Sequence, residues 1–279
     1  MRQLRLPNWI RRHMPWYELS LRTPAEWEGL RLRLAKLSHP QPAVSIVMPV
    51  YNEAESLAAT LSSMGDLLLS DVFGVELIVV NDGSTDHTQE ILDRLGVKTI
   101  SWAENKGRKH ARQAGLEAAG GQYLLQADAD TLYPPSWGLL YVRALADPEI
   151  AVVYGPHAFL PGPGMPRPAL LLHELMGDTM RWIKRKRTSH TYINVHGFNS
   201  GFRRQDALEK GSYDFEPGGS EDGHMARLLN QYGKIAYLND NGCTAYTSSR
   251  RLAADGGLIR AIFKRMRRDL GRLLRYLRT

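Results

Sequence analysis

The sequence predicts an α/β fold with a mostly parallel sheet and helices on both of its faces. Over the first half of the chain, short apolar runs alternate with segments whose apolar residues recur at helical spacing. Hydrophobic residues make up 43 % of the 279 residues, which is enough for a sizeable core in one large domain or two closely packed halves. Sheets of this kind bind ligands at the carboxyl ends of their strands, near a change in strand order.

Local patterns predict each element in turn. Val44–Val50 is an apolar run of strand length, and Leu57, Leu61 and Met64 follow it at helical spacing. Two glycines at 120–121 end a later helical segment. The predicted strands are 44–50, 75–80, 97–102, 123–127, 152–154 and 235–238, and the predicted helices are 53–69, 86–95, 106–119, 169–186 and 221–232.

Changes in composition divide the chain into three parts. The stiff segment His39–Pro42 separates a basic N-terminal extension (1–42) from a domain over 43–255. Within that domain, a proline- and glycine-rich loop at 161–168 is expected to separate a nucleotide-binding half (43–160) from an acceptor half (161–255).

The positive charge is concentrated at the two ends. Residues 1–38 and 256–279 each contain eight lysines and arginines, against three acids and one acid respectively, although the net charge of the chain is only +7. From Leu258 onward the apolar residues share one helical face, which predicts a basic amphipathic helix over 256–279. This helix is expected either to dock on the domain or to lie at an anionic membrane surface. The basic run at 181–187 and the N-terminal tryptophans favour the membrane, or an anionic acceptor, and no motif predicts nucleic-acid binding.

Several classes of protein are excluded or disfavoured. The single cysteine, Cys243, excludes an intrachain disulfide framework and a cysteine-based zinc site. No run of about 18 apolar residues predicts a membrane span. The N-terminus has no apolar core typical of a signal peptide, so we expect a cytoplasmic protein, with the inner face of the membrane as its candidate contact.

Two acidic motifs follow predicted strands. Asn81-Asp82-Gly83-Ser84 comes directly after the strand 75–80, and its acid either faces the ligand crevice or only forms the turn. Asp128-Ala129-Asp130 follows the strand 123–127. Two neighbouring carboxylates repel each other unless a cation lies beside them, and a divalent cation with a bound diphosphate meets that need.

A third acidic motif begins a predicted helix. Ser220 is a candidate N-cap, and Glu221-Asp222-Gly223-His224 forms the first turn after it. Acids in this position stabilise a helix dipole, whereas a glycine-flanked acid on a mobile loop is also typical of a general base. Both readings remain open from these residues alone.

Together with the opening Val44-Ser45-Ile46-Val47-Met48-Pro49-Val50-Tyr51-Asn52-Glu53, these motifs resemble those of the family 2 inverting glycosyltransferases of GT-A fold. Further matches are Asn105-Lys106-Gly107, Ala111-Arg112 and the segment 197–204, so the resemblance covers roughly residues 43–250. Processive members carry a Gln-x-x-Arg-Trp motif after the last strand, and its absence here indicates the non-processive type.

The resemblance implies a role for each matching residue. The residues expected to bind the nucleotide and donor sugar are Pro49, Tyr51, Glu53, Asp82, Lys106, Arg112, Asp128, Ala129 and Asp130. Asp82 is expected to pair with the base, Asp130 to bind Mn²⁺ or Mg²⁺, and Asp222 to act as the catalytic base. Asn81 stands where the family has a further acid, which leaves the nucleotide preference open.

Other residues are candidates for contact with the acceptor or the diphosphate. They are Asn199, Ser200, Glu221, His224, Arg250 and Arg251. A turn role is the alternative for Asn199 and Ser200, a packing role for His224, and a solvated position for the two arginines.

The implied reaction moves a sugar from a nucleoside diphosphate, with UDP as the expected nucleotide, to an acceptor hydroxyl on a lipid-linked molecule or polysaccharide. Asp222 would take the hydroxyl proton in a single inverting displacement assisted by the metal. The alternatives are a non-catalytic, membrane-docked protein of the same fold and a sugar-phosphate nucleotidyltransferase. The nucleotidyltransferase is disfavoured because Pro49–Glu53 is not a glycine-rich basic loop, and the non-catalytic protein because all three acidic motifs are present.

Overall fold

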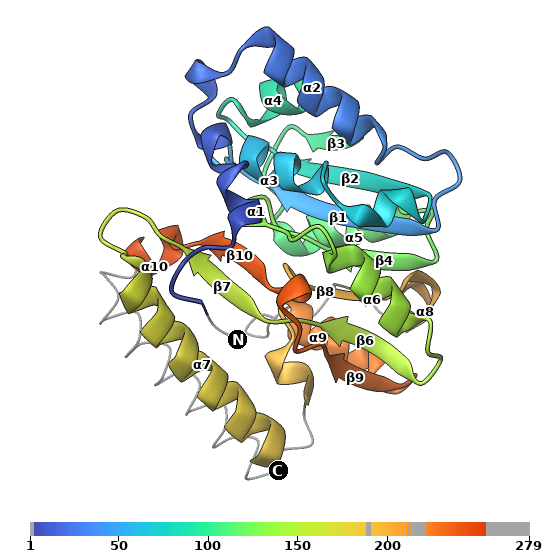
Figure 1. Ribbon diagram of the computed structural model, residues 1–279. Coiled ribbons are helices and arrows are strands. Elements are labelled where there is room, and N and C mark those ends of the chain that lie inside the picture. The colour runs from blue at the N-terminus through green and yellow to red at the C-terminus, as the bar shows by residue number, and fades with distance from the viewer. Residues whose placement is uncertain (1–2, 188–190, 211–212, 214–220, 255–279) are drawn as a thin grey trace.

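The computed structural model describes residues 3–187, 191–210, 213 and 221–254 (Figure 1). Strands in these residues are β1 (Val44–Val50), β2 (Val75–Asp82), β3 (Thr99–Trp102), β4 (Tyr123–Gln126), β5 (Thr131–Leu132), β6 (Ile150–Tyr154), β7 (His157–Leu160), β8 (Ser200–Arg203), β9 (Lys234–Tyr237) and β10 (Ala245–Ser248). The α-helices are α1 (Asn8–Arg11), α2 (Pro24–Ala35), α3 (Leu57–Met64), α4 (Thr88–Leu95), α5 (Arg108–Ala118), α6 (Trp137–Leu145), α7 (Arg167–Arg187), α8 (Arg204–Lys210), α9 (Glu221–Leu229) and α10 (Arg250–Ala254). Short 3₁₀ helices are η1 (Met14–Tyr17), η2 (Leu19–Leu21), η3 (Leu68–Asp71), η4 (Thr191–Asn194) and η5 (Asn241–Cys243).

The main sheet has seven strands in the order β3-β2-β1-β4-β8-β6-β9. Its strands are parallel except for β8, which runs antiparallel to both β4 and β6. A second sheet of three strands, β5-β10-β7, lies beside the ends of β4 and β6 (Figure 1). The α/β class and the mostly parallel sheet are therefore confirmed, and the six predicted strands are present within two residues at each end.

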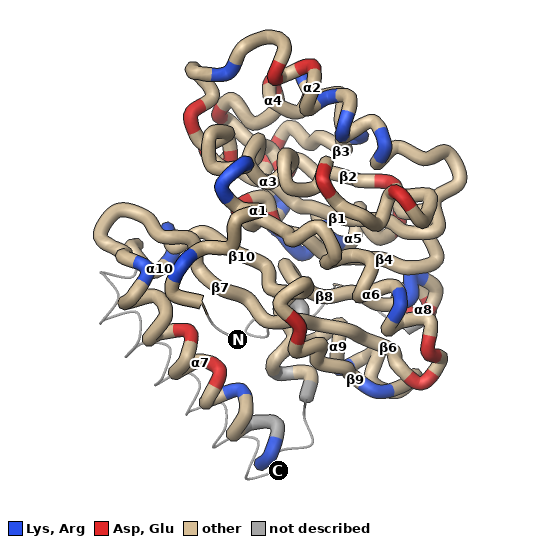
Figure 2. Tube along the Cα trace, viewed as in Figure 1, with Lys and Arg blue, Asp and Glu red and all other residues tan. Residues whose placement is uncertain are grey.

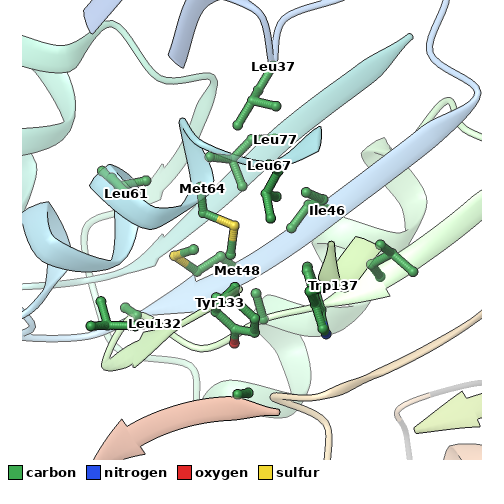
Figure 3. Packing of buried hydrophobic residues seen from close by; sticks show 14 of the residues in the cluster. Leu37, Ile46, Met48, Leu61, Met64, Leu67, Leu77, Leu132, Tyr133 and Trp137 are labelled. Atoms are coloured by element: carbon green, nitrogen blue, oxygen red, sulfur yellow. The ribbon is translucent and has the colours of Figure 1, made fainter. Parts of the chain in front are cut away.

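Helices cover both faces of the main sheet because successive side chains of a strand point to opposite sides. Ile46 and Met48 of β1 belong to the larger core cluster, with α3 and α6, whereas Val47 belongs to a second cluster with α5 and α9. Figure 3 shows Ile46 and Met48 packed near Met64 and Trp137 in the larger core cluster. Every residue of β1 is buried, as expected for a strand covered on both faces.

The N-terminal segment is part of the larger core. Ile10, Trp16 and Trp27 are buried, and the rings of Trp16 and Trp27 meet edge to face with their centroids 5.3 Å apart. Helix α2 begins with a capping box between Thr23 and Glu26. The rings of Trp16 and Trp27 are thus used for packing, so these two tryptophans do not support the expected membrane contact.

Two other basic regions were candidates for membrane contact. The run at 181–187 forms the C-terminal end of α7, and the arginines of α10 lie beside the other end of that helix (Figure 2). The predicted helix over 256–279 lies outside the described residues. Among the helices that are described, none is both long and apolar enough to cross a bilayer.

Candidate active site

The loop after β1 is held in place by the turn after β2. Ser84 Oγ accepts a hydrogen bond from the Asn52 amide at 2.9 Å, and Asn52 Oδ1 accepts one from the Thr85 amide at 2.8 Å. Asp86 and Thr88 accept further hydrogen bonds from amides of the same loop. Asn52 has a positive φ of 52°, a conformation that asparagine tolerates better than most residues. These contacts explain why α3 begins at Leu57 instead of residue 53, and they fix the positions of Tyr51 and Glu53.

Asp82 ends β2 with its carboxylate satisfied by the main chain. Its two oxygens accept hydrogen bonds from the amides of Lys106 at 2.7 Å and Gly107 at 2.9 Å, just before α5 begins. Gly83 has a φ of 71°, and a Cβ there would lie 2.5 Å from the carbonyl carbon of Glu104. Only glycine therefore allows the turn to approach this segment so closely. Asp82 thus brings to the site a carboxylate whose hydrogen-bond donors are uncharged main-chain amides.

Asn81 belongs to the turn itself. Its side-chain oxygen accepts a hydrogen bond from the Ser84 amide at 3.2 Å, and its side-chain nitrogen donates to Gln89 Oε1 at 2.7 Å. The residue that departs from the family pattern thus supports local structure.

Asp128 is anchored from behind by Arg112 of α5. The guanidinium is buried, donates to Asp128 Oδ1 at 2.9 Å and to the carbonyl of Gly197 at 3.0 Å. The Asp128 amide donates to the hydroxyl of Tyr133, which donates in turn to the Phe198 carbonyl. Arg112 therefore reaches the site through Asp128 instead of lining the cavity.

Asp130 is buried with weaker hydrogen-bond support than its neighbours. The hydroxyls of Thr131 and Thr247 lie 3.3 and 3.4 Å from Oδ1, and an Arg250 nitrogen lies 3.8 Å from Oδ2. Burial, and then the charges of Asp128 and Glu53, raise the pKa of Asp130 from 3.8 to about 6, against the lowering effect of Arg251 and Arg250. A cation beside this carboxylate would stabilise its charged form.

The chemistry of Asp130 fits a divalent ion. Mg²⁺ and similar hard cations bind one or two carboxylates and take the remaining oxygen ligands from water and substrate phosphates. In the described part of the chain, no group of three or more acidic, histidine or cysteine side chains forms a ready metal cage. Asp130 would therefore supply one carboxylate to such an ion, with water and phosphate oxygens as the remaining ligands.

Arg250 of α10 bridges the acids of this site. It forms an ion pair with Glu53, and its other nitrogen lies 3.8 Å from Glu55. Glu53 also accepts a hydrogen bond from Ser56 Oγ at 2.7 Å. The acidic cluster, defined as Glu53 and Asp130, is thus partly balanced by one arginine that lies 197 residues from Glu53 along the chain.

Tyr17 of η1, in the N-terminal segment, has a buried hydroxyl that lies within range of the charges of this acidic cluster. Burial raises the pKa of its hydroxyl, Asp130 and Glu53 raise it further, and Arg250 opposes them. Within the described residues, the buried hydroxyl has no hydrogen-bond partner. No sequence signal pointed to this residue, because it lies outside every motif.

The acids surround a cavity of about 240 Å³ at the carboxyl edge of the main sheet. Of the site residues predicted from the sequence, those that line the cavity are Pro49, Tyr51, Glu53, Asp82, Asp128, Ala129, Asp130 and Arg251. The other lining residues are Val50, Asn105, Gly107 and Arg108. Asn105 and Arg108 were missed as site residues, although they flank or belong to the matched segment at 105–107. Lys106 lies next to them with its ammonium over the Trp102 ring, 4.6 Å from the centroid.

Asn199 and Ser200, candidates for either ligand contact or a structural role, do not line the cavity, and their contacts support the structural role. Asn199 accepts hydrogen bonds from Trp137 and Tyr141 at 2.7 Å and donates to the carbonyls of Pro156 and Cys243. Ser200 is buried in β8 and donates to Gln126. All four hydrogen-bonding positions of the Asn199 amide are used, so its role is to join α6, β7 and β8 at their ends.

Helix α9 begins at Glu221, so the third acidic motif forms its first turn as predicted. The side chains of Glu221 and Asp222 lie outside the described residues. His224, one position further on from Gly223, is partly buried, and burial followed by the charge of Arg227 lowers its pKa.

The family model for glycosyl transferase family 2 matches residues 45–209, which is more than half of the chain. The chain belongs to this family. The Staphylococcus epidermidis poly-β-1,6-N-acetyl-D-glucosamine synthase is 35 % identical over 107 residues, or 37 % of this chain and 25 % of the relative. The Yersinia pestis undecaprenyl-phosphate 4-deoxy-4-formamido-L-arabinose transferase is 36 % identical over 107 residues, or 36 % of this chain and 32 % of the relative. The chain thus spans only a quarter to a third of the length of these family 2 proteins.

Solved structures identify the fold of this family 2 protein as GT-A. The mannosyltransferase PcManGT of Pyrobaculum calidifontis, solved with GDP-mannose and Mn²⁺, has a TM-score of 0.55 to this chain. The two share 19 % of their residues over 92 % of this chain and 75 % of the other. At this identity the likeness carries the fold alone.

Proposed function

We propose that this protein transfers a sugar from a nucleoside diphosphate to an acceptor hydroxyl, with inversion at the sugar. The observation that carries the proposal is the pairing of Asp82 and Asp130 around one cavity at the carboxyl edge of the sheet. One acid is held by main-chain amides, and the other is buried with only weak donors and a nearby arginine. A nucleotide base would add one hydrogen bond to the first acid, and a metal-bound diphosphate would place a cation beside the second.

The donor would lie along the cavity from Asp82 to Asp130. Pro49 and Tyr51 would contact the base, and Asp82 would accept a hydrogen bond from its edge while keeping its main-chain donors. Asp128 would face the ribose and sugar, held by Arg112. Asp130 would hold Mn²⁺ or Mg²⁺, which supplies positive charge where the leaving diphosphate becomes more negative.

Arg250 and Arg251 would bind the diphosphate. Both lie at the start of α10, beside Asp130, and Arg251 lines the cavity. A guanidinium is suited to this role because its planar donors match the oxygens of a phosphate.

Asp222 would act as the base that accepts the proton of the acceptor hydroxyl. An acid in the first turn of a helix is stabilised in its ionised form, which a base requires before reaction. The deprotonating oxygen would attack the anomeric carbon from the face opposite the diphosphate.

The acceptor is proposed to be a polysaccharide or a lipid-linked molecule. One relative is named as a polysaccharide synthase and the other as a transferase to undecaprenyl phosphate. The basic end of α7 is a further reason to favour an anionic acceptor or the membrane surface that holds it. We propose a peripheral position on the inner face of the membrane.

Thermal unfolding tests the donor site. UDP, GDP, dTDP and CDP would each be added with and without Mn²⁺ to the wild type and to Asp130→Ala. A ligand at 100 times its dissociation constant adds about 2.7 kcal/mol to the free energy of unfolding, so its effect is easy to measure. We expect stabilisation by one nucleotide, UDP first, that needs Mn²⁺ and is lost in Asp130→Ala. No stabilisation by any nucleotide would overturn the proposal.

A further inference from the structure

Tyr17 presents a buried hydrogen-bond donor that the protein itself does not use. Its hydroxyl is screened from solvent and has no partner within the described residues. Most buried polar groups in folded proteins are hydrogen-bonded, so an exception at a candidate active site calls for an explanation. Because burial and the neighbouring acids raise its pKa, the phenol stays protonated and remains a donor.

The N-terminal segment ties Tyr17 to two walls of the donor site. Helix η1 packs against α3, and His13 Nδ1 lies 2.9 Å from Ser62 Oγ on that helix. Upstream, the Trp9 ring meets the Tyr246 ring of β10 edge to face at 5.9 Å. Figure 1 shows α1 between α3 and β10. Glu53 precedes α3, and Thr247 of β10 contacts Asp130, so the segment spans the two elements that carry the acidic cluster.

The group that would accept a hydrogen bond from the Tyr17 hydroxyl follows from the change that a bound diphosphate would cause around Glu53. In the described structure the charge of Glu53 is balanced by Arg250, and Ser56 supplies one further hydrogen bond. If Arg250 turned to a diphosphate, Glu53 would lose its cation although its side chain is only 18 % exposed. Asp130 would then be occupied by the metal, which leaves Glu53 as the acid in need of a donor.

We propose that Tyr17 is a positioning residue of the donor site, whose hydroxyl donates a hydrogen bond to the Glu53 carboxylate when a metal-bound nucleoside diphosphate draws Arg250 away. Tyr17 lies outside residues 45–209, so the N-terminal segment would complete a site that the family domain only partly forms. This inference rests on the proposed function.

Tyr17→Phe removes the hydroxyl and keeps the ring, and Tyr232→Phe is its matched control. Tyr232 also has a buried hydroxyl without a partner in the described residues, but it lies after α9 and packs with the cluster on the other face of the sheet. Each variant would be titrated with Mn²⁺ and the nucleoside diphosphate that stabilises the wild type most, and followed by the shift in melting temperature.

We expect Tyr17→Phe to weaken nucleotide binding by about tenfold, since the lost hydrogen bond has a charged acceptor. Its melting temperature without ligand should stay unchanged or rise, because an unpartnered buried hydroxyl is removed. Tyr232→Phe should bind the nucleotide as the wild type does. In a Glu53→Gln background, the further loss from Tyr17→Phe should shrink to twofold or less, which a merely structural tyrosine would not produce.

Equal nucleotide affinity in Tyr17→Phe and the wild type would overturn the inference and leave the proposed function standing. A lower melting temperature without a change in affinity would also overturn it, since Tyr17 would then only support packing. Failure of every nucleotide to stabilise the wild type would overturn the proposed function, and the Tyr17 inference with it.

Discussion

The turns after β2 and β4 both place an acid at the same cavity, but they satisfy these acids in different ways. Asp82 receives two main-chain amides from residues just before α5, so its surroundings are nearly complete without a ligand. Asp130 depends on Glu53, Arg250 and Thr247, which come from both ends of the domain. Two acids that look equivalent in the sequence therefore lie in different surroundings. Asp82 is suited to a neutral partner, and Asp130 to a cation.

The largest effect should come from replacing each acid by its amide. Asp130→Asn should lower sugar transfer by about 10³-fold or more, because the charge that stabilises the leaving diphosphate is lost. Asp82→Asn should mainly weaken nucleotide binding, by about tenfold, and keep the dependence on Mn²⁺. Steady-state kinetics over a range of Mn²⁺ concentrations separate these outcomes. If both variants lost their response to Mn²⁺ equally, the contrast between the two acids would fail.

Arg112→Leu should cause the largest loss of stability in the site. The change leaves the Asp128 carboxylate without its buried cation and the Gly197 carbonyl without its donor. Removing one partner of a buried ion pair costs about 3–5 kcal/mol, which denaturant unfolding measures directly. The double variant Arg112→Leu/Asp128→Asn should recover part of this loss, because no unpaired charge remains. A double variant no more stable than Arg112→Leu would argue against the ion pair as the cause.

The raised pKa of Asp130 predicts that the stability of the protein depends on pH. The native protein retains a proton on Asp130 up to pH about 6, whereas the unfolded chain releases it near pH 3.8, the ordinary pKa of an aspartate. Between these values the native state binds more protons, so the free energy of unfolding should fall as pH rises. The fall amounts to about 3 kcal/mol at most. The melting temperature of Asp130→Asn, relative to the ligand-free wild type, should therefore rise from pH 4 to pH 6, and a constant difference would contradict the assignment.

The features predicted from sequence are those whose signals are local. The run Val44–Val50 and the acids after the strands at 75–80 and 123–127 can each be recognised within about ten residues. Strand β8 was missed because it is short, contains a glycine and an arginine, and enters the sheet between β4 and β6 in the opposite direction. Its position depends on pairing with distant strands, which no local pattern records.

The parts of the site that were missed depend on contacts between distant residues. Arg250 was a candidate for the diphosphate, but its ion pair with Glu53 joins residues 197 positions apart. Tyr17 reaches the cluster only because Trp16 and Trp27 fold the N-terminal segment onto α3 and α4. For residues 1–42 the sequence predicted only a basic extension. Charge can be recognised from a short stretch of sequence, whereas the packing of irregularly spaced aromatic residues cannot.

The smallest effect is expected at the residue that departs from the family pattern. Asn81 uses its side-chain oxygen for the Ser84 amide and its nitrogen for Gln89, so neither atom is available to the base. Asn81→Asp would keep the first contact and replace the donor to Gln89 by an acceptor, at a cost of about 1 kcal/mol in stability. Nucleotide affinity should change by less than about threefold, and the order of preference among UDP, GDP, dTDP and CDP should stay the same. A switch in that order would mean that the acid of the family pattern contacts the base after all, and that the turn after β2 is less complete than its hydrogen bonds indicate.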